Sequence, residues 1–285
     1  MSSFLDTMLE RAKADKQTIV LPEGDDPRTL EAAETILAQG VANLIILGNV
    51  AAIKESGRAL DGATLIDPQD SDLHDEFANT LYELRKHKGM TLEQAAEKVR
   101  DVLFFGVLMV KTGRADGMVS GACHSTGDVL RPSLQILKTA PGVKLVSSFF
   151  IMVVPNCEYG QNGTFLFSDC GLEIQPDAEK LAHIAVNSAQ SWKTLIGTEP
   201  VVAMLSHSTY GSAKNDDANK VVRAVEMAHE LDPSLELDGE LQLDAAIVPS
   251  VGESKAPSSR VAGHANVLIF PDLDAGNIGY KLVQR

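Results

Sequence analysis

The segment Asp116-Gly-Met-Val-Ser-Gly-Ala-Cys-His-Ser-Thr-Gly-Asp-Val-Leu-Arg-Pro-Ser-Leu-Gln-Ile136 joins a short apolar run, a polar turn and a helical pattern. Residues 117–119 predict a buried strand, and Ser125 or Thr126 can cap the helix that follows. Pro132 lacks a backbone N–H, so this helix is expected either to kink or to begin late. A strand that leads directly into a helix is typical of a parallel α/β protein.

The same alternation continues toward both ends of the chain. Pro27 opens a segment in which Leu30, Ala33 and Leu37 share one helical face. The predicted strands span residues 18–21, 44–47, 64–66, 117–119, 144–154, 164–167, 201–205, 245–248 and 267–270. This regular pattern predicts an α/β fold of two three-layer αβα domains with mostly parallel sheets.

The chain length and one long apolar run indicate where the two domains meet. A chain of 285 residues exceeds the usual size of a single domain. Residues 144–154 form a long run that is expected to be buried, so we predict domains at residues 1–145 and 146–285. Near the C-terminus, Asn277 is predicted to cap a final helix.

The composition excludes several classes of function. A net charge of −14 argues against a nucleic-acid or anionic-membrane surface, which needs a broad positive field. No apolar run reaches the length of a membrane span, and the N-terminus lacks the apolar core of a signal peptide. The three cysteines form neither a zinc pattern nor a disulfide framework. We therefore expect a cytoplasmic protein with no metal site, in which a local basic pocket can still hold a small anion.

Four loops at the ends of predicted strands are rich in glycine and polar residues. In parallel sheets, ligands bind beyond the carboxyl ends of the strands, where loops lead into helix N-termini. The loops span residues 21–28, 120–128, 205–214 and 270–281. In the second loop, a helix N-terminus could bind an anion together with Arg131, although spacing alone favours an ordinary capped helix.

Other polar features carry weaker signals. The basic run 85–89 could hold phosphate, but a helix C-terminus that stops at Gly89 explains it slightly better. The hydroxyl groups of residues 206–214 could bind a small oxyanion or only form a solvated turn. Asp272 and Asp274 are more typical of caps and turns than of magnesium ligands. His124 and His207 are weak acid–base candidates.

Several common signatures are absent from the sequence. There is no Gly-x-x-x-x-Gly-Lys-Ser/Thr loop, no Gly-x-Gly-x-x-Gly after a strand and no Gly-x-Ser-x-Gly turn. This lowers the expectation of an NTPase, a Rossmann dehydrogenase or an α/β hydrolase.

With these residues identified, the chain resembles the phosphate acetyltransferase (phosphotransacetylase) family from residue 1 to residue 285. The resemblance rests on several segments that together are highly specific: residues 21–28, 83–89, 116–122, 128–136, 155–160, 163–169, 238–249 and 270–285. It implies a homodimer of two-domain α/β subunits with the active site in a cleft between the domains. It also implies the reversible conversion of acetyl-CoA and phosphate into CoA and acetyl phosphate, with CoA as a substrate and no other cofactor.

The resemblance also assigns residues. Family arginines for CoA binding and catalysis match Arg28, Arg85, Arg131 and Arg285 in this sequence. We expect Arg131 and Arg285 to be catalytic, and Arg28 and Arg85 to bind CoA or supply positive charge. The remaining predicted substrate contacts are Ser125 and Thr126 for phosphate, with Tyr280 and Lys281 as donors in the cleft.

The family pattern continues beyond residue 285 with an Asp-Leu-Ser-Arg-Gly-Cys-Ser type motif and a following acidic residue. By resemblance, that segment returns to the first domain and supplies the base for the CoA thiol, so we expect little activity from a chain that lacks it. Three alternatives remain open at this point. They are a phosphate butyryltransferase, a non-catalytic module that senses acyl-CoA, and a metal-dependent decarboxylating dehydrogenase of related architecture.

Overall fold

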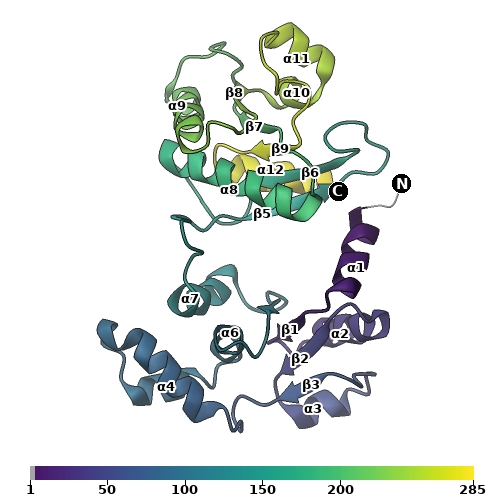
Figure 1. Ribbon diagram of the computed structural model, residues 1–285, viewed down its shortest axis with the longest axis vertical. Coiled ribbons are helices and arrows are strands. Elements are labelled where there is room, and N and C mark those ends of the chain that lie inside the picture. The colour runs from purple at the N-terminus through teal and green to yellow at the C-terminus, as the bar shows by residue number, and fades with distance from the viewer. Residues whose placement is uncertain (1–3) are drawn as a thin grey trace. The chain divides into compact units, whose positions relative to one another are not determined.

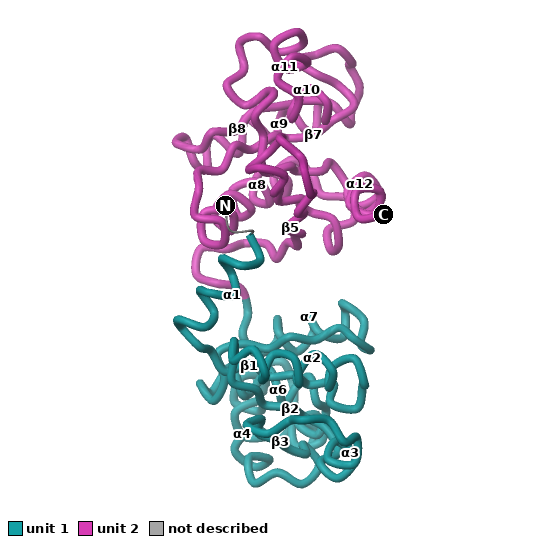
Figure 2. Tube along the Cα trace, turned by 90° about the vertical axis from the view of Figure 1, so that its right-hand side faces the viewer, with its two compact units in different colours: residues 1–138 teal, residues 139–285 magenta. Residues whose placement is uncertain are grey.

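The computed structural model describes residues 4–285 and divides into two compact units, residues 1–138 (unit 1) and 139–285 (unit 2) (Figure 1, Figure 2). The sequence analysis placed the domain boundary after residue 145, which lies inside unit 2. The interdomain cleft implied by the resemblance stays a prediction.

Unit 1 contains a four-stranded parallel sheet in the order β3-β2-β1-β4. Its elements are α1 (Phe4–Ala14), β1 (Thr18–Leu21), α2 (Pro27–Gln39), β2 (Asn43–Leu47), α3 (Val50–Glu55), β3 (Thr64–Ile66), α4 (His74–Arg85), a 3₁₀ turn (Lys86–Lys88), α5 (Leu92–Lys98), α6 (Val102–Lys111), β4 (Gly117–Met118) and α7 (Thr126–Ile136). Strand β1 lies between β2 and β4, so the loops that follow β1 and β4 leave the same edge of the sheet side by side.

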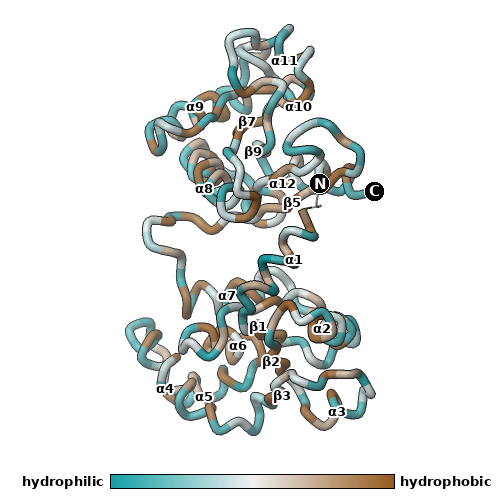
Figure 3. The backbone as a smooth tube through the Cα atoms, turned by 45° about the vertical axis from the view of Figure 1, so that its right-hand side comes forward, coloured by the Kyte–Doolittle hydropathy of each residue, from teal (hydrophilic) through white to brown (hydrophobic). Residues whose placement is uncertain are grey.

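Helices cover both faces of this sheet. On one face, Leu21, Leu44 and Ile46 pack against α2 and α3. On the other face, Val20 and Ile45 pack against α4, α5 and α6. Because both faces are buried, β1 and β2 are almost continuously hydrophobic, which Figure 3 shows in brown.

Unit 2 contains a five-stranded sheet in the order β5-β6-β9-β7-β8. Its elements are β5 (Phe149–Val153), β6 (Thr164–Ser168), α8 (Ala178–Ile196), β7 (Val202–Leu205), α9 (Asp216–Leu231), β8 (Leu237–Leu241), α10 (Leu243–Ile247), α11 (Pro249–Lys255), β9 (Val267–Ile269) and α12 (Leu273–Gln284). The edge strand β5 is antiparallel to β6, and all other pairs are parallel.

The sheet of unit 2 is also covered on both faces. One face packs against α8 and α9, where the single tryptophan, Trp192, is fully buried. The other face packs against α10, α11 and α12, with Phe167 and Phe270 in contact across it. Both units therefore confirm the predicted α/β fold with three layers and mostly parallel sheets.

Three local predictions in unit 2 are wrong. The run 144–154 was expected to be a buried strand, but only Phe149–Val153 forms one, at the edge of the sheet, and Phe149, Phe150 and Val153 are exposed. Residues 245–248 do not form a strand, because helix α10 occupies Leu243–Ile247 and buries Ala245 and Ala246. Four apolar residues in succession fit a buried strand and a buried helix equally well. Strand β8 was missed because its sequence, Leu-Asp-Gly-Glu-Leu, lacks β-branched residues and contains glycine and acidic side chains.

The final helix begins earlier than predicted. Asp272 is its N-cap, because the Asp272 carboxylate accepts a hydrogen bond of 2.9 Å from the Ala275 N–H. Asn277, the predicted cap, lies inside α12 and donates its amide to the Cys170 carbonyl oxygen. The interpretation of Asp272 as a cap is confirmed. Among residues 4–285, no helix is both long and apolar enough to cross a membrane.

Candidate functional site

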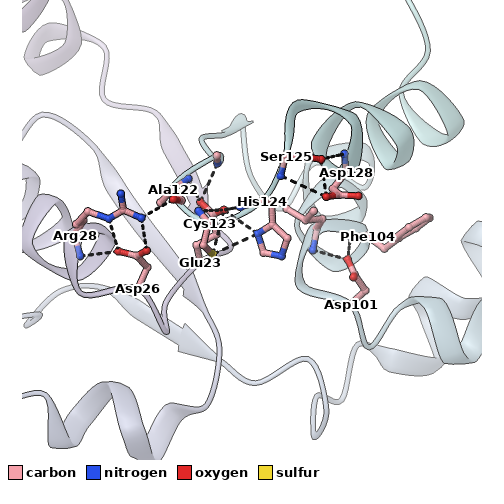
Figure 4. A network of polar contacts seen from close by, with 12 residues as sticks. Glu23, Asp26, Arg28, Asp101, Phe104, Ala122, Cys123, His124, Ser125 and Asp128 are labelled. Carbon is pink, nitrogen blue, oxygen red and sulfur yellow. Dashed lines mark hydrogen bonds and ion pairs between the residues drawn. The ribbon is translucent and has the colours of Figure 1, made fainter.

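The loops after β1 and β4 are joined by one buried carboxylate. Glu23 follows β1, and only 4% of its surface is exposed. Its Oε2 accepts hydrogen bonds from the N–H groups of Gly121 and Ala122 at 2.9 and 2.8 Å. Its Oε1 accepts from the N–H groups of Cys123 and His124, both at 3.0 Å. Figure 4 shows that this single side chain holds the whole turn that leads into α7.

The His124 ring adds a further bond to the same carboxylate. Its Nδ1 lies 2.8 Å from Glu23 Oε1. Burial raises the pKa of Glu23, but the Cys123 N–H, the His124 ring and the N–H groups of Ala122 and Gly121 together lower it from 4.5 to about 2. Glu23 is therefore ionised at neutral pH and acts only as an acceptor.

Glu23, Cys123 and His124 bring three ligand-type atoms within 4.8 Å of one another. Each Glu23 oxygen already accepts at least two N–H groups, so little acceptor capacity remains for a cation. Burial and the Glu23 charge also raise the pKa of the Cys123 thiol, whereas a metal needs the thiolate. The arrangement fits a hydrogen-bonded turn better than a metal centre.

Replacing Glu23 with glutamine is expected to reduce the stability of unit 1 in a pH-dependent way. The pKa of Glu23 is lowered on folding, so its stabilisation is present above about pH 4.5 and is lost as the pH falls toward 2. The shift corresponds to about 3 kcal/mol at neutral pH. Urea unfolding followed by circular dichroism from pH 7 to pH 3 should show a difference from wild type that shrinks with acidity. Glu31→Gln, at an exposed position on α2, is the control, and an equal loss at every pH would contradict the assignment.

Arg28 connects the same two loops from the other side. Its Nε and Nη2 lie 3.0 and 2.7 Å from the Asp26 carboxylate, and Nη2 also donates to the Ala122 carbonyl oxygen at 2.5 Å. The side chain is 70% exposed, so water screens this ion pair. The charge of Arg28 is thus shared with Asp26, and a phosphate at this position would have to compete with Asp26.

Helix α7 begins where the sequence predicted. Ser125 is its N-cap in a capping box with Asp128: the Ser125 hydroxyl accepts from the Asp128 N–H and donates to the Asp128 carboxylate. The helix starts at Thr126 and contains Pro132, so the late start did not occur. Within residues 4–285, the N–H groups of Thr126 and Gly127 have no hydrogen-bond acceptor.

Two predicted arginines of unit 1 differ in their surroundings. Arg131 lies on α7 with 63% of its side chain exposed, and its nearest carboxylate oxygen, on Asp128, is 4.0 Å away. Arg85 ends α4, and its Nε is buried without a hydrogen-bond partner. The chain after Arg85 forms the 3₁₀ turn and stops at Gly89 with φ = 84°, which confirms the predicted helix end. Of these two arginines, Arg131 is therefore the one whose side chain is the more exposed to a ligand.

The remaining predicted residues lie on α12 in unit 2. The Tyr280 ring stacks on Phe150 with 4.3 Å between the ring centroids. Lys281 Nζ donates to the Tyr280 hydroxyl oxygen at 2.9 Å and to Asn277 Oδ1 at 3.0 Å. Arg285 is exposed at the end of the helix. The structure therefore groups Tyr280 with Lys281, and it divides the predicted site residues between the two units.

The polar loop after β7 is mainly organised by its own contacts. The buried Glu240 carboxylate accepts the Ser208 hydroxyl and the Gly211 N–H, each at 2.7 Å. Thr209 and Gln242 also bond to each other. Since these hydroxyl groups are engaged, this loop is a weaker oxyanion site than its composition indicated.

A cavity of about 550 Å³ lies beside the Glu23 loop in unit 1. Its wall is mostly apolar, with Ile19, Leu21 and Leu44 from the sheet and Ile36 from α2. Arg28 also lines it. These walls suit an apolar group rather than a phosphate.

Sequence reasoning ranked His124 low and gave Glu23 no role. Both lie in loops that the sequence analysis had selected. Their contact depends on β1 and β4 being neighbours, which the sequence pattern does not reveal. The signals available in the sequence were the carboxylate of Glu23 in one strand-end loop and the glycine-containing turn before His124 in another.

Comparisons with known proteins agree on one family. The family model for phosphate acetyl/butaryl transferase matches residues 3–285. The chain is 58% identical to the phosphate acetyltransferase of Acetivibrio thermocellus, over 99% of this chain and 86% of that protein. It is 52% identical to the phosphate acetyltransferase of Clostridium acetobutylicum, with the same coverage. A solved phosphotransacetylase from Streptococcus pyogenes is 45% identical, with a TM-score of 0.91 over all of this chain and 87% of that one.

Proposed function

Because this chain belongs to the phosphate acetyl/butaryl transferase family, we propose that the start of α7 forms the phosphate end of its active site. The chain is a phosphate acetyltransferase that converts acetyl-CoA and phosphate reversibly into CoA and acetyl phosphate. The proposal concerns which side chains carry out this reaction.

The observation that carries the proposal is the unpaired positive potential at the start of α7. The N–H groups of Thr126 and Gly127 lack acceptors among the residues described, and Arg131 follows within the same helix. Glu23 lies nearby, but five N–H donors surround its charge. A phosphate at this position would therefore meet two N–H groups without acceptors and the Arg131 guanidinium, whose nearest carboxylate oxygen, on Asp128, is 4.0 Å away.

The other predicted residues take supporting roles in this proposal. Thr126 supplies a hydroxyl donor to phosphate, while Ser125 acts mainly as the cap that fixes the helix start. Arg85 and Arg28 bind the anionic groups of CoA. In unit 2, Tyr280, Lys281 and Arg285 are proposed as further donors to CoA or acetyl phosphate. A homodimer in the cytoplasm is proposed from the family resemblance.

The reaction requires a nucleophilic thiolate and a stabilised oxyanion. A free thiol has a pKa of about 8.5, so a base must take its proton near neutral pH. The thiolate then attacks the carbonyl carbon of acetyl phosphate, and phosphate leaves. Arg131 and the N–H groups at the start of α7 stabilise the charge on phosphate as the bond breaks. The reaction as proposed needs no metal and no cofactor besides CoA as substrate.

Thioester formation with two acyl phosphates tests the function directly. With CoA present, acetyl phosphate is expected to give the thioester at a higher kcat/KM than butyryl phosphate. The absorbance of the thioester follows the reaction, and omission of CoA is the control. Binding of acetyl-CoA without any turnover would indicate a sensing module instead.

A further inference from the structure

The geometry of His124 is that of an imidazole held for proton transfer. Its backbone N–H and its ring Nδ1 both contact Glu23 Oε1, at 3.0 and 2.8 Å. One carboxylate, whose side chain is 2% exposed, therefore holds both the backbone and the ring of His124. The histidine side chain itself is 30% exposed, and its Nε2 has no hydrogen-bond partner anywhere in residues 4–285. Figure 4 shows this nitrogen on the side of the ring that faces away from Glu23.

The carboxylate decides which ring nitrogen carries the proton. Glu23 is ionised and can only accept, so the short contact requires a proton on His124 Nδ1. In the neutral ring, Nε2 then holds the lone pair and can accept a proton. The same ring can therefore take up a proton at Nε2 and return it without moving.

We propose that His124 is the acid–base residue for the phosphate substrate, and that Glu23 is its positioning residue. This inference rests on the proposed site at the start of α7. His124 comes directly before Ser125, which is the N-cap of that helix. It assigns to His124 a proton transfer distinct from the removal of the CoA thiol proton.

The proton balance of the reaction shows why such a group is useful. When CoA thiolate attacks acetyl phosphate, the C–S bond forms and the bond between the acetyl carbon and the phosphate oxygen breaks. Unprotonated, the departing group would be PO₄³⁻, a strong base and a poor leaving group. The imidazolium donates its Nε2 proton to that oxygen, which gives HPO₄²⁻ and neutral His124. In the reverse direction, neutral His124 takes the proton from HPO₄²⁻ as it attacks acetyl-CoA.

Other charged and titratable groups also lie near the ring. Asp128 faces His124 from α7: its pKa is lowered mainly by Ser125, with smaller contributions from Arg131 and His124. The Cys123 thiol lies 3.6 Å from His124 Nδ1. On the β1 side, the groups are Glu23 and the Asp26–Arg28 ion pair. Charges of both signs therefore surround the ring.

Two substitutions at His124 separate the ring's anchoring from its chemistry. In His124→Asn, the amide nitrogen can replace Nδ1 and keep the bond to Glu23, but nothing replaces Nε2. In His124→Gln, the amide nitrogen reaches the position of Nε2 and can still donate a hydrogen bond, but it cannot transfer a proton. Both variants are expected to lose roughly 100-fold in kcat. The KM for phosphate should rise in His124→Asn and stay near wild type in His124→Gln, with the KM for CoA unchanged in both.

The pH profile provides a result that a purely structural role would not give. In wild type, kcat/KM for acetyl phosphate should fall as the pH rises, because the protonated ring of His124 is the proposed donor. This limb should disappear in both variants. Wild-type kcat and an unchanged profile in His124→Asn would overturn the proposal. If Arg131→Ala and His124→Asn are both without effect, the site at α7 is wrong; if only His124→Asn is without effect, this inference alone fails.

Nuclear magnetic resonance gives a readout that does not depend on turnover. With ¹⁵N-labelled histidine, Nδ1 of His124 should stay protonated across the titration while Nε2 changes state. Inorganic phosphate should shift the Nε2 resonance in wild type, and less in Arg131→Ala. A neutral ring that carries its proton on Nε2, or no response to phosphate, would also overturn the proposal.

Discussion

Alanine in place of Arg131 is expected to lower kcat/KM for phosphate and for acetyl phosphate by about 10²–10³-fold, the usual loss when one charge-stabilising donor is removed. Arg131 is 63% exposed on α7 and has only the distant contact with Asp128, so its guanidinium can bind a ligand at little cost. The effect should fall mainly on kcat, because the charge on phosphate increases as the bond to the acetyl carbon breaks. Initial rates in both directions, at varied phosphate and CoA, measure it.

Two further variants show whether a loss of activity in Arg131→Ala comes from the guanidinium of Arg131 itself. Arg131→Lys keeps the charge but loses the planar pair of donors, so it should retain part of the activity. Arg114→Ala removes another arginine of unit 1, whose guanidinium pairs with Glu76 at 2.6 Å, and should leave the rates unchanged. If Arg131→Ala and Arg114→Ala both keep the wild-type kcat and KM, Arg131 has no part in the reaction.

Alanine in place of Asp169 is expected to reduce the free energy of unfolding of unit 2 by about 3–5 kcal/mol, because four hydrogen bonds to one charged acceptor are lost and each such bond contributes roughly 1.5–3 kcal/mol before the structure relaxes. Asp169 is 2% exposed and follows β6. Its carboxylate accepts the Ser148 N–H and hydroxyl at 2.7 and 2.6 Å. It also accepts the N–H groups of Gly171 and Leu172, both at 2.8 Å. Without it, four donors would be left buried or would have to rearrange.

Trp192 makes this effect measurable in a two-domain chain. It is the single tryptophan and is fully buried in unit 2, so its fluorescence during urea unfolding reports that unit. Asp169→Asn keeps one acceptor oxygen and should cost less than Asp169→Ala. Asp217→Ala, at an exposed position in the first turn of α9, should change stability by at most about 1 kcal/mol. Equal midpoints for Asp169→Ala and Asp217→Ala would contradict the role of Asp169.

The sequence predicted the fold well where one local signal was sufficient. Pro27 and the spacing of Leu30 and Ala33 located α2, and the four residues Leu44–Leu47 located β2. In α2 the helical spacing and Pro27 indicate one structure, and in β2 the β-branched residues Ile45 and Ile46 favour a strand over a helix. Residues 245–248 lacked such a signal, and the helix α10 packs in a cluster with Val261 and Ala262, which are distant from any local pattern.

The candidate site was less predictable, because its contacts join distant parts of the chain. The cap at Ser125 is local, and the sequence identified it correctly. The Glu23–His124 pair joins residues about a hundred positions apart, and it exists only because β4 lies beside β1. Spacing along the chain contains no information about strand order, so a glutamate in one loop could not be matched to a turn in another.

A crystal structure of the protein with inorganic phosphate and CoA tests the proposed site most directly. The phosphate is expected at the start of α7, within hydrogen-bond distance of the Arg131 guanidinium, the Thr126 and Gly127 N–H groups and His124 Nε2. Phosphate bound instead at the loop of residues 206–214, with Arg131 and His124 in contact only with solvent, would contradict it.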